Sequence, residues 1–245
     1  MKNKFESAIA THIGCLRKEN QDSGFVSRDR RILCVSDGMG GHNGGGRASK
    51  LAIAAIRRNS RVGMLPDYTN KQAVATWAEE AIQEANAEIW LAARKSRSLK
   101  DMGTTIVLIV LADGFAHVAH LGDSRAYRLR NGRLYRLTSD HSSVQELIDS
   151  GKLRNADRNK HLDLHEVTRW LPDRQVVIQH RRLLANTGDI YLLTSDGLTD
   201  VVSDIEIKQA LKGRLGLKRK LTKLVRQTLK AGAPDNVTVA LSQNG

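Results

Sequence analysis

Short apolar runs bounded by glycine, asparagine or aspartate recur along this chain and restrict what it can fold into. Such runs are typical of β-strands, because the bounding residues are the common turn formers. We expect strands at residues 7–13, 32–36, 104–111, 115–121, 126–130, 134–137, 176–180, 190–194 and 237–241. In AYRLRNGRLYRL, Asn131 and Gly132 supply the two positive-φ residues of a tight hairpin turn. The chain is therefore expected to build antiparallel sheets.

Helical patterns interrupt the strands in two regions. Residues 47–58 and 71–96 follow a glycine-rich loop, and residues 217–231 carry leucines on one side and Lys and Arg on the other. In the second segment the apolar residues at helical spacing are Val74, Ala78, Ala81, Ile82, Ala85 and Ile89. Helices in blocks between antiparallel strands predict an α+β layered domain rather than a doubly wound parallel sheet.

Length and composition are consistent with one domain over residues 1–245. The chain is 40% apolar, which is enough for a large core. Its two cysteines, Cys15 and Cys34, match no disulfide framework and no zinc spacing, so we expect reduced bystander thiols in a cytoplasmic protein. The longest apolar stretch, residues 106–112, is far shorter than the roughly 20 residues of a membrane helix. No membrane span is expected, and we expect a monomer.

Aspartate, in most cases beside glycine, recurs where an expected strand begins or ends. The stretches CVSDGMGG, AHLGDSRA, LLTSDGLTD and GAPDNVTV contain Asp37, Asp123, Asp196, Asp200 and Asp235. A single Asp-Gly pair is explained by turn formation alone. As a converging set, however, the carboxylates would repel one another unless cations held them together. Oxygen ligands without histidine or cysteine favour Mg²⁺ or Mn²⁺, and two such ions can activate a water for in-line attack on phosphorus.

Two further residues fit chemistry on a phosphate group. Arg17, in CLRKENQD, could grip a phosphoryl group through two hydrogen bonds, although an isolated arginine is more often a surface ion-pair residue. Gly38 lacks a side chain, so its backbone carbonyl could approach an ion closely.

Six motifs, in order, resemble those of the PP2C (PPM) family of metal-dependent serine/threonine protein phosphatases. They are CLRKENQD, VSDGMGGH, MGTT, HLGDSRAYRLRNGRLYRLTSDHS, LLTSDGLTDVV and PDNVTV. The resemblance covers residues 11–241 and is to the bacterial single-domain type. It implies a sandwich of two antiparallel β-sheets flanked by α-helices on both sides, with metal ions at one edge.

The resemblance also implies a role for each candidate residue. Asp37 would bridge two Mg²⁺ or Mn²⁺ ions, with the carbonyl of Gly38 beside it. The other implied ligands are Asp196 and Asp235 for the first ion, Asp22 for the second, partly through water, and Asp123 with Asp200 for a third, weaker ion. Arg17 would grip the phosphate while a hydroxide bridging the two ions attacks phosphorus, without a covalent enzyme intermediate.

The chain departs from the family pattern in three places. Gln21 stands where the family often has glutamate, which predicts a weaker second metal site. Met39, Gly40 and Gly41 separate the Asp-Gly pair from His42, the candidate general acid, and bacterial members share this insertion. Residues 143–174 are expected to form a flap that selects substrates, but they lack the His-Pro-x-x-Asn pattern often found there.

The formal charge of +13 favours anionic partners and leaves two alternatives to an enzyme. One is a basic nucleic-acid-binding module, but aromatic residues are only 4% and no reader motif occurs, so no nucleic-acid partner is expected. The other is a phosphoprotein-binding module without catalysis, which the retention of Arg17, Asp37, Asp196 and Asp235 disfavours.

Partners follow from the enzymatic interpretation. We expect phosphorylated proteins as substrates, among them a serine/threonine kinase that the phosphatase opposes and forkhead-associated-domain proteins. The basic side of the expected helix at residues 217–231 is interpreted as a solvated face, and the alternative interpretation is docking to an acidic partner.

Overall fold

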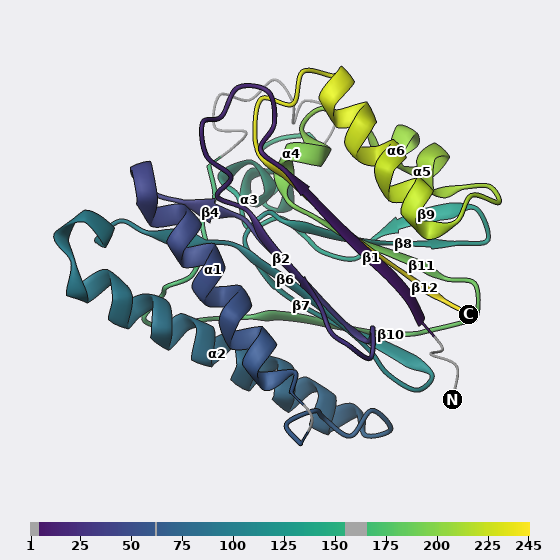
Figure 1. The fold of residues 1–245 in the computed structure, drawn as a ribbon, viewed down its shortest axis with the longest axis horizontal. Helices are drawn as coiled ribbons and strands as arrows, with labels where there is room; N and C mark the ends of the chain where they lie inside the picture. Colours follow the sequence, from purple (N-terminus) through teal and green to yellow (C-terminus); the bar gives the residue numbers. More distant parts are fainter. Residues whose placement is uncertain (1–4, 62, 155–165) are drawn as a thin grey trace.

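Two five-stranded antiparallel sheets lie face to face in the structure (Figure 1). The structure is a computed structural model that describes residues 5–61, 63–154 and 166–245. At residues 41–43 it describes the backbone but not the side chains. The first sheet contains, in spatial order, β1 (Phe5–His12), β12 (Val237–Asn244), β11 (Ile190–Thr194), β8 (Arg125–Arg130) and β9 (Arg133–Arg136). The second contains β10 (Gln179–Leu184), β7 (Phe115–Leu121), β6 (Ile106–Leu111), β3 (Ile32–Ser36) and β2 (Ser23–Val26). A short pair, β4 (Gly38–Met39) with β5 (Gly103–Thr104), stands apart from both sheets.

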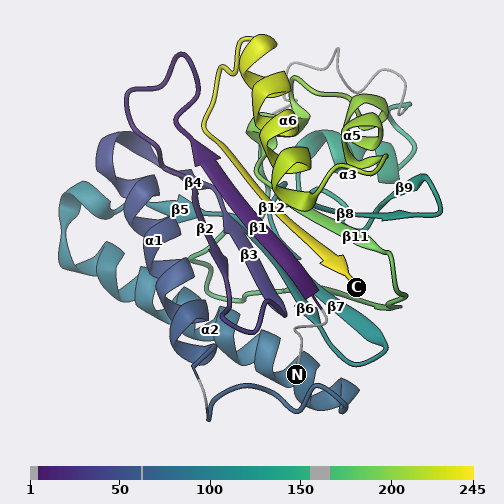
Figure 2. The same cartoon turned by 45° about the vertical axis from the view of Figure 1, so that its right-hand side comes forward.

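Helices cover the outer face of each sheet (Figures 1 and 2). The second sheet is covered by α1 (Gly41–Asn59) and α2 (Lys71–Lys95), which η1 (Arg97–Leu99) follows. The first sheet is covered by α5 (Asp204–Leu211) and α6 (Leu217–Lys230), with the single turn α4 (Asp196–Thr199) at its end. α3 (Ser143–Asp149) follows β9. This order of layers, helices, sheet, sheet, helices, is the expected αββα sandwich.

Each inner strand is buried on both faces, and its side chains alternate between two cores. In β6, Ile106, Leu108 and Val110 pack beneath α1 and α2, whereas Val107, Ile109 and Leu111 pack between the sheets. Since successive side chains of a strand point to opposite faces, a strand covered on both sides reads as one continuous apolar run. The stretch IVLIVL is therefore a central strand of this sandwich and shows no polar alternation.

The strand and hairpin predictions are confirmed in outline and corrected in detail. The β8–β9 hairpin closes with Arg130 opposite Arg133, and Asn131 and Gly132 have φ angles of 50° and 72°. The strand expected at residues 176–180 is wrong in position, because β10 begins at Gln179 and Ile178 is buried beside the helices without strand pairing. The glycine-rich loop was expected to precede the first helix, but α1 already begins within it.

The ends of the described chain lie side by side, because β1 pairs with β12 along its whole length and Phe5 stands opposite Asn244 (Figure 2). Both cysteines are free thiols, with Cys15 exposed and Cys34 buried. Among the described residues, no helix combines the length and the apolar character needed to cross a membrane.

A buried histidine, His117, makes the stability of this fold depend on pH. His117 of β7 is 4% exposed, and its Nε2 lies 3.0 Å from Nδ1 of His180 on β10, whose Nε2 lies 2.6 Å from Oε2 of Glu79. Burial first, and then the charges of His180 and Arg182, lower the pKa of His117 to about 4. A histidine in the unfolded chain takes up its proton near pH 6.5, so protons favour the unfolded state between these values.

We therefore expect the contribution of His117 to be complete above pH 6.5 and to be lost as the pH falls toward 4. At pH 5 it should lower the free energy of unfolding by about 2 kcal/mol relative to pH 7.5. Urea unfolding at the two pH values measures this difference, and His117→Gln, which does not titrate, should show a difference smaller by that amount. The same pH dependence in both proteins would contradict the assignment.

Candidate active site

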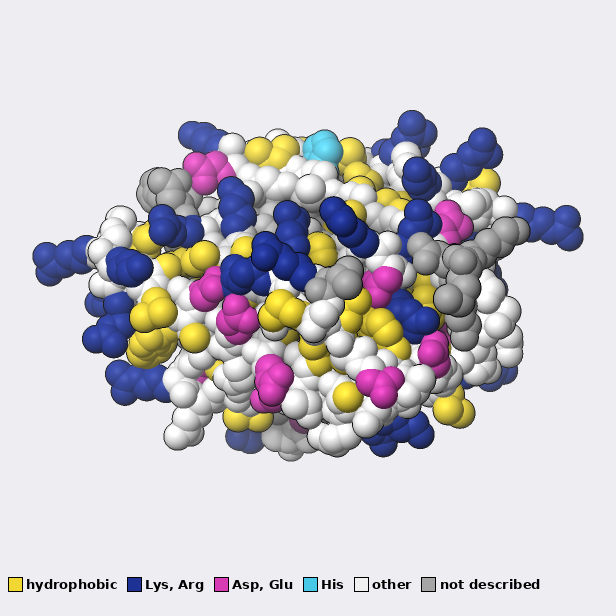
Figure 3. Space-filling view, turned by 60° about the horizontal axis from the view of Figure 1, so that its bottom comes forward, with side chains coloured by type: hydrophobic (Ala, Val, Ile, Leu, Met, Phe, Trp, Pro, Cys, Tyr) yellow, Lys and Arg dark blue, Asp and Glu magenta, His cyan; other side chains and the backbone are white. Residues whose placement is uncertain are grey.

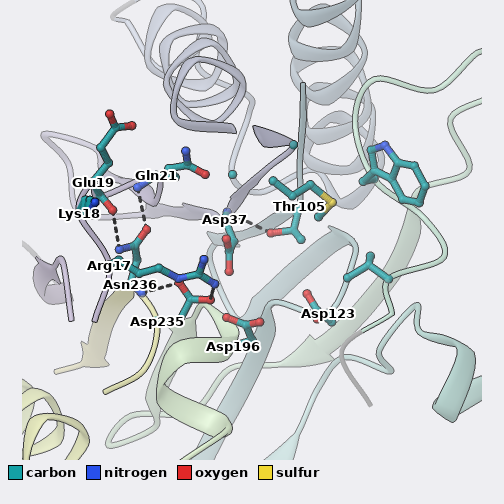
Figure 4. Close-up of a pocket in the computed structure, with 15 residues that line it drawn as sticks. Arg17, Lys18, Glu19, Gln21, Asp37, Thr105, Asp123, Asp196, Asp235 and Asn236 are labelled. Atoms are coloured by element: carbon teal, nitrogen blue, oxygen red, sulfur yellow. Dashed lines mark hydrogen bonds and ion pairs between the residues drawn. The ribbon is translucent and has the colours of Figure 1, made fainter. Parts of the chain in front are cut away.

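A pocket of about 680 Å³ opens at the end of the sandwich where strands of both sheets terminate (Figure 4). Six of the nine residues singled out in the sequence line it, namely Arg17, Asp37, Gly38, Asp123, Asp196 and Asp235. Asp22 and Asp200 do not line the pocket, but both interact electrostatically with Asp196. The side chain of His42 is outside the described side chains, and its backbone lies in the first turn of α1.

The strand topology explains why these aspartates meet. Asp37 directly follows β3 of the second sheet, and Asp123 lies in the turn from β7 to β8, which joins the two sheets. Asp196 follows β11 and opens α4, and Asp235 lies just before β12, so both come from the first sheet. Figure 4 shows the carboxylates of Asp37, Asp196 and Asp235 pointing into one space. Residues almost 200 positions apart thus form one acidic cluster.

Electrostatics make this cluster costly without cations. Desolvation raises the pKa of Asp37 well above its ordinary value, and the charges of Asp22, Asp196 and Asp123 raise it further. The pKa of Asp123 is raised by desolvation and then by Asp196, and that of Asp200 by the same two causes in the same order. Burial raises the pKa of Asp22 to about 7. Carboxylates that raise one another's pKa in this way are stabilised by bound cations.

The donor set fits hard divalent cations. Oδ2 of Asp22 accepts a hydrogen bond of 2.7 Å from Ser195, whereas its Oδ1 is buried and receives none from any described residue. A buried carboxylate oxygen without a donor costs free energy unless a proton or a cation meets it. Over the described ranges, no three Asp, Glu, His or Cys side chains are already drawn together as a finished metal site. The carboxylates line an open pocket instead, and their oxygen atoms are the ligands that Mg²⁺ and Mn²⁺ prefer.

A guanidinium lies at the mouth of this acidic pocket. Nη2 of Arg17 lies 2.5 Å from Oδ2 of Asp235, and the Arg17 side chain is 58% exposed. The hydrogen bond from Arg17 and the charge of Asp235 raise the pKa of the guanidinium. Because the guanidinium carries five N–H donors in a planar fork, it retains donors for an incoming phosphoryl group while one of them engages Asp235.

Close packing of the backbone requires glycine at position 38. A Cβ atom on Gly38 would lie 2.2 Å from the carbonyl oxygen of Gly45 and 2.6 Å from that of Gln21. The first turns of α1 therefore pack directly against the residue that follows Asp37. This contact accounts for the glycine independently of the metal-ligand role that the sequence suggests for its carbonyl.

Thr105 positions the backbone of Asp37 and had no role in the sequence-based assignment. Its Oγ1 accepts a 3.1 Å hydrogen bond from the Asp37 amide, and its own amide donates to the Asp37 carbonyl at 2.8 Å. The same hydroxyl lies 2.7 Å from Oγ of Ser124, next to Asp123. Thr105 thus joins two carboxylate-bearing turns. It belongs to the MGTT motif, but only the folded strands reveal its partners.

Asn236 is the second residue whose role the sequence did not reveal. Its Oδ1 accepts from the Gln21 amide at 2.8 Å, and its Nδ2 donates to the carbonyls of Ile13 and Glu19 at 2.8 and 2.9 Å. The side chain is buried and follows Asp235 directly. Asn236 therefore holds the loop that carries Arg17 against the acidic cluster.

We expect Asn236→Ala to lower the free energy of unfolding by about 2–3 kcal/mol, because it removes three hydrogen bonds between a buried side chain and the backbone of the loop. Urea unfolding measures the change. Asn186→Ala is the matched control, since the exposed Asn186 side chain makes no hydrogen bond to a described residue, and it should change stability by less than about 0.5 kcal/mol. Equal stability changes in the two variants would show that Asn236 does not hold the loop.

The chain matches a known family over almost its whole length. Residues 17–243 match the family model described as Protein phosphatase 2C. The chain belongs to the protein phosphatase 2C family. This phosphatase is 35% identical over 235 residues to the serine/threonine phosphatase stp of Listeria monocytogenes, with 94% of this chain and 92% of the relative covered. It is 34% identical over 229 residues to PstP of Mycobacterium tuberculosis, covering 94% of this chain and 43% of that one.

Solved structures of relatives agree with the fold of this phosphatase. A crystal structure of the Mycobacterium tuberculosis phosphatase PstP superposes with a TM-score of 0.89 at 33% identity, covering 98% of both chains. A structure of the PstP catalytic domain in complex with two manganese ions gives a TM-score of 0.85 at 33% identity, covering 98% of this chain and 97% of that one. The expected fold and the expected class, a protein serine/threonine phosphatase of a metal-dependent family, are confirmed.

Proposed function

We propose that this protein hydrolyses phosphoserine and phosphothreonine in proteins in a reaction that needs two divalent ions, Mg²⁺ or Mn²⁺. The observation that carries the proposal is one pocket in which partly buried carboxylates from both sheets lie beside a guanidinium. Membership of the protein phosphatase 2C family supports it. A phosphoprotein-binding module would not need carboxylates that repel one another in this way.

The carboxylates divide into sets that would hold the ions. Asp37, Asp196 and Asp235, with the carbonyl of Gly38, would hold the first ion, and Asp37 with Asp22 the second. The orphaned Oδ1 of Asp22 supports its place in this set. We propose Asp123 and Asp200 for a third, weaker ion. Gln21, whose side chain carries no charge, would leave the second site weaker than a glutamate would.

Two ions bound there would lower the pKa of a water between them and so supply the nucleophile for direct attack on phosphorus, without a covalent enzyme intermediate. Arg17 orients the phosphoryl group and stabilises the charge that moves onto its oxygens in the transition state. His42 is our candidate for the group that protonates the leaving oxygen. Its place in the first turn of α1, two residues after the pocket-lining Gly40, supports that candidacy.

We further propose that residues 1–245 act as one catalytic unit in which residues 143–174 form a flap. Ser142 pairs with Val167, Thr104 pairs with Leu171, and Val167 and Trp170 line the catalytic pocket. Residues 155–165 of this segment lie outside the described residues. By analogy with the family, we propose that the enzyme opposes a serine/threonine kinase, with that kinase and forkhead-associated-domain proteins among its substrates.

Hydrolysis of matched peptides tests the function directly. The wild-type protein should release phosphate from phosphoserine and phosphothreonine peptides in the presence of Mn²⁺ or Mg²⁺, and EDTA should abolish the release. A phosphotyrosine peptide of the same sequence, at equal concentration, tests the residue preference. Turnover that survives EDTA would overturn the metal-dependent mechanism, and binding of the phosphopeptides without any turnover would favour the non-catalytic module.

A further inference from the structure

A second pocket adjoins the catalytic one and has no part in the proposed chemistry. It has a volume of about 730 Å³ and lies at the C-terminal end of α2 and along η1. We call it the basic groove and define it by Trp90, Arg94, Lys95, Arg97, Lys100 and Trp170. The C-terminal end of α2 lies at the left-hand edge of the view in Figure 3, and Lys and Arg side chains surround hydrophobic ones there.

The positive charge of the basic groove is not compensated within the described part of the protein. Its four cationic side chains are exposed, and none of them forms an ion pair with a described residue. The pocket contains one carboxylate, that of Asp101. Other arginines of this basic chain differ, since Arg58, Arg125 and Arg130 are each engaged by a carboxylate. The groove is therefore a concave surface with a net positive field.

Trp170 connects the basic groove to the catalytic pocket, because it lines both. The indole lies against the backbone of β5, where a Cβ on Gly103 would be only 2.8 Å from its Cδ1. The next residue, Leu171, exchanges two backbone hydrogen bonds of 2.8 Å with Thr104. The two pockets thus share one wall, and that wall is held by the strand next to the catalytic site.

A second anchor holds the segment that follows Trp170. The side chain of Asn86 on α2 donates to the carbonyl of Asp173 at 2.9 Å and accepts from its amide at 2.8 Å. The guanidinium of Arg174 lies 6.0 Å from the centre of the Trp90 ring. Residues 171–173 are therefore fixed to both β5 and α2, so the groove is formed before any ligand arrives.

We propose that the basic groove binds acidic residues of the same phosphoprotein whose phosphorylated side chain enters the catalytic pocket. This inference rests on the proposed function. The shared wall at Trp170 lets one extended chain lie in both pockets, and four unpaired cations complement Asp and Glu side chains. The two indoles offer apolar surface to the stems of those side chains. The substrate class is thus a phosphoserine or phosphothreonine peptide with acidic residues on one side.

Kinetics on three phosphothreonine peptides test the inference. One has neutral flanks, one has four acidic residues on the N-terminal side, and one has the same four on the C-terminal side. We expect one acidic peptide to exceed the neutral one by about tenfold in kcat/KM, mainly through a lower KM, which is the size expected for a few exposed ion pairs. Raising the ionic strength from about 0.05 to about 0.5 M should remove most of this preference.

Reversing charges in the basic groove tests whether the groove causes the preference for acidic peptides. Arg97→Glu with Lys100→Glu should reduce the acidic-to-neutral ratio to about one, whereas Lys218→Glu with Arg219→Glu, the same change of net charge on exposed residues of α6, should retain it. Hydrolysis of para-nitrophenyl phosphate by the wild type reports on the proposed function alone. If the wild type turns over the peptides without preferring the acidic ones, or if both double variants lose the preference equally, the proposed role of the basic groove is wrong. If the wild type hydrolyses neither the peptides nor para-nitrophenyl phosphate, the proposed function itself is wrong.

Discussion

Asp37→Asn is expected to lower kcat/KM for a phosphothreonine peptide by about a thousandfold, or about 4 kcal/mol in transition-state stabilisation. Asp37 interacts electrostatically with Asp22, Asp196 and Asp123, and it is the one residue that belongs to the sets proposed for both ions. The amide occupies nearly the same volume but carries no charge, so it is expected to weaken both proposed metal sites at once. Initial rates at saturating Mn²⁺ measure the effect.

Two comparisons make this result specific. Asp113→Asn, an exposed carboxylate paired with Arg31 at 3.0 Å and remote from the pocket, should retain wild-type rates. In the metal-free state, Asp37→Asn should be more stable than the wild type by about 1 kcal/mol, because it removes repulsion among the clustered carboxylates. An active and metal-dependent Asp37→Asn enzyme would remove Asp37 from the mechanism.

Divalent ions are expected to stabilise the folded protein. Binding to the folded state alone adds about 2.7 kcal/mol when the free ion is at 100 times its Kd. For a chain of 245 residues this corresponds to a rise in Tm of about 5–10 °C. The rise is expected because cations relieve the repulsion that raises the pKa values of Asp37 and Asp123. Thermal unfolding with Mn²⁺, Mg²⁺ or EDTA measures it.

The Asp37→Asn protein supplies the control for this stabilisation. It should lose most of the rise in Tm, whereas NaCl at the same ionic strength should not reproduce the rise in the wild type. If millimolar Mn²⁺ left the Tm of the wild type unchanged, or raised that of Asp37→Asn equally, the carboxylate cluster would not be the metal site. This readout does not depend on catalysis, so it also separates weak metal binding from a defect in the chemical steps.

Local patterns in the sequence predicted the parts of the fold that are set locally. The hairpin turn at Asn131 and Gly132 depends on neighbours along the chain and is found. The strand expected at residues 104–111 is found as β6 from Ile106 to Leu111, whereas Thr104 belongs to β5. The strand expected at residues 176–180 was misplaced, because its pairing with β7 is fixed by tertiary packing. Ser203 and Glu206, a capping box at the start of α5, were a usable local signal that was overlooked.

In the candidate site too, features set by local sequence could be predicted and features set by tertiary packing could not. The aspartates at the strand ends could be identified in the sequence, because each belongs to a short turn motif beside an apolar run. Asn236 could not, since its three partners lie more than 210 positions away and only the fold brings them together. The basic groove also has no sequence signature of its own. Its cations come from α2, from η1 and from Lys100 just after η1, whereas its shared wall, Trp170, comes from a segment beyond β9.

Asp37 ends a strand of one sheet, whereas Asp196 and Asp235 flank strands of the other. An ion held by all three would cross-link the two halves of the sandwich at one end. Sliding of the sheets past each other would then require release of the ion. The affinity for the ion would therefore depend on how tightly the core between the sheets is packed. A cavity made at Leu193, which packs between the sheets and far from solvent, should weaken metal binding without altering a single ligand.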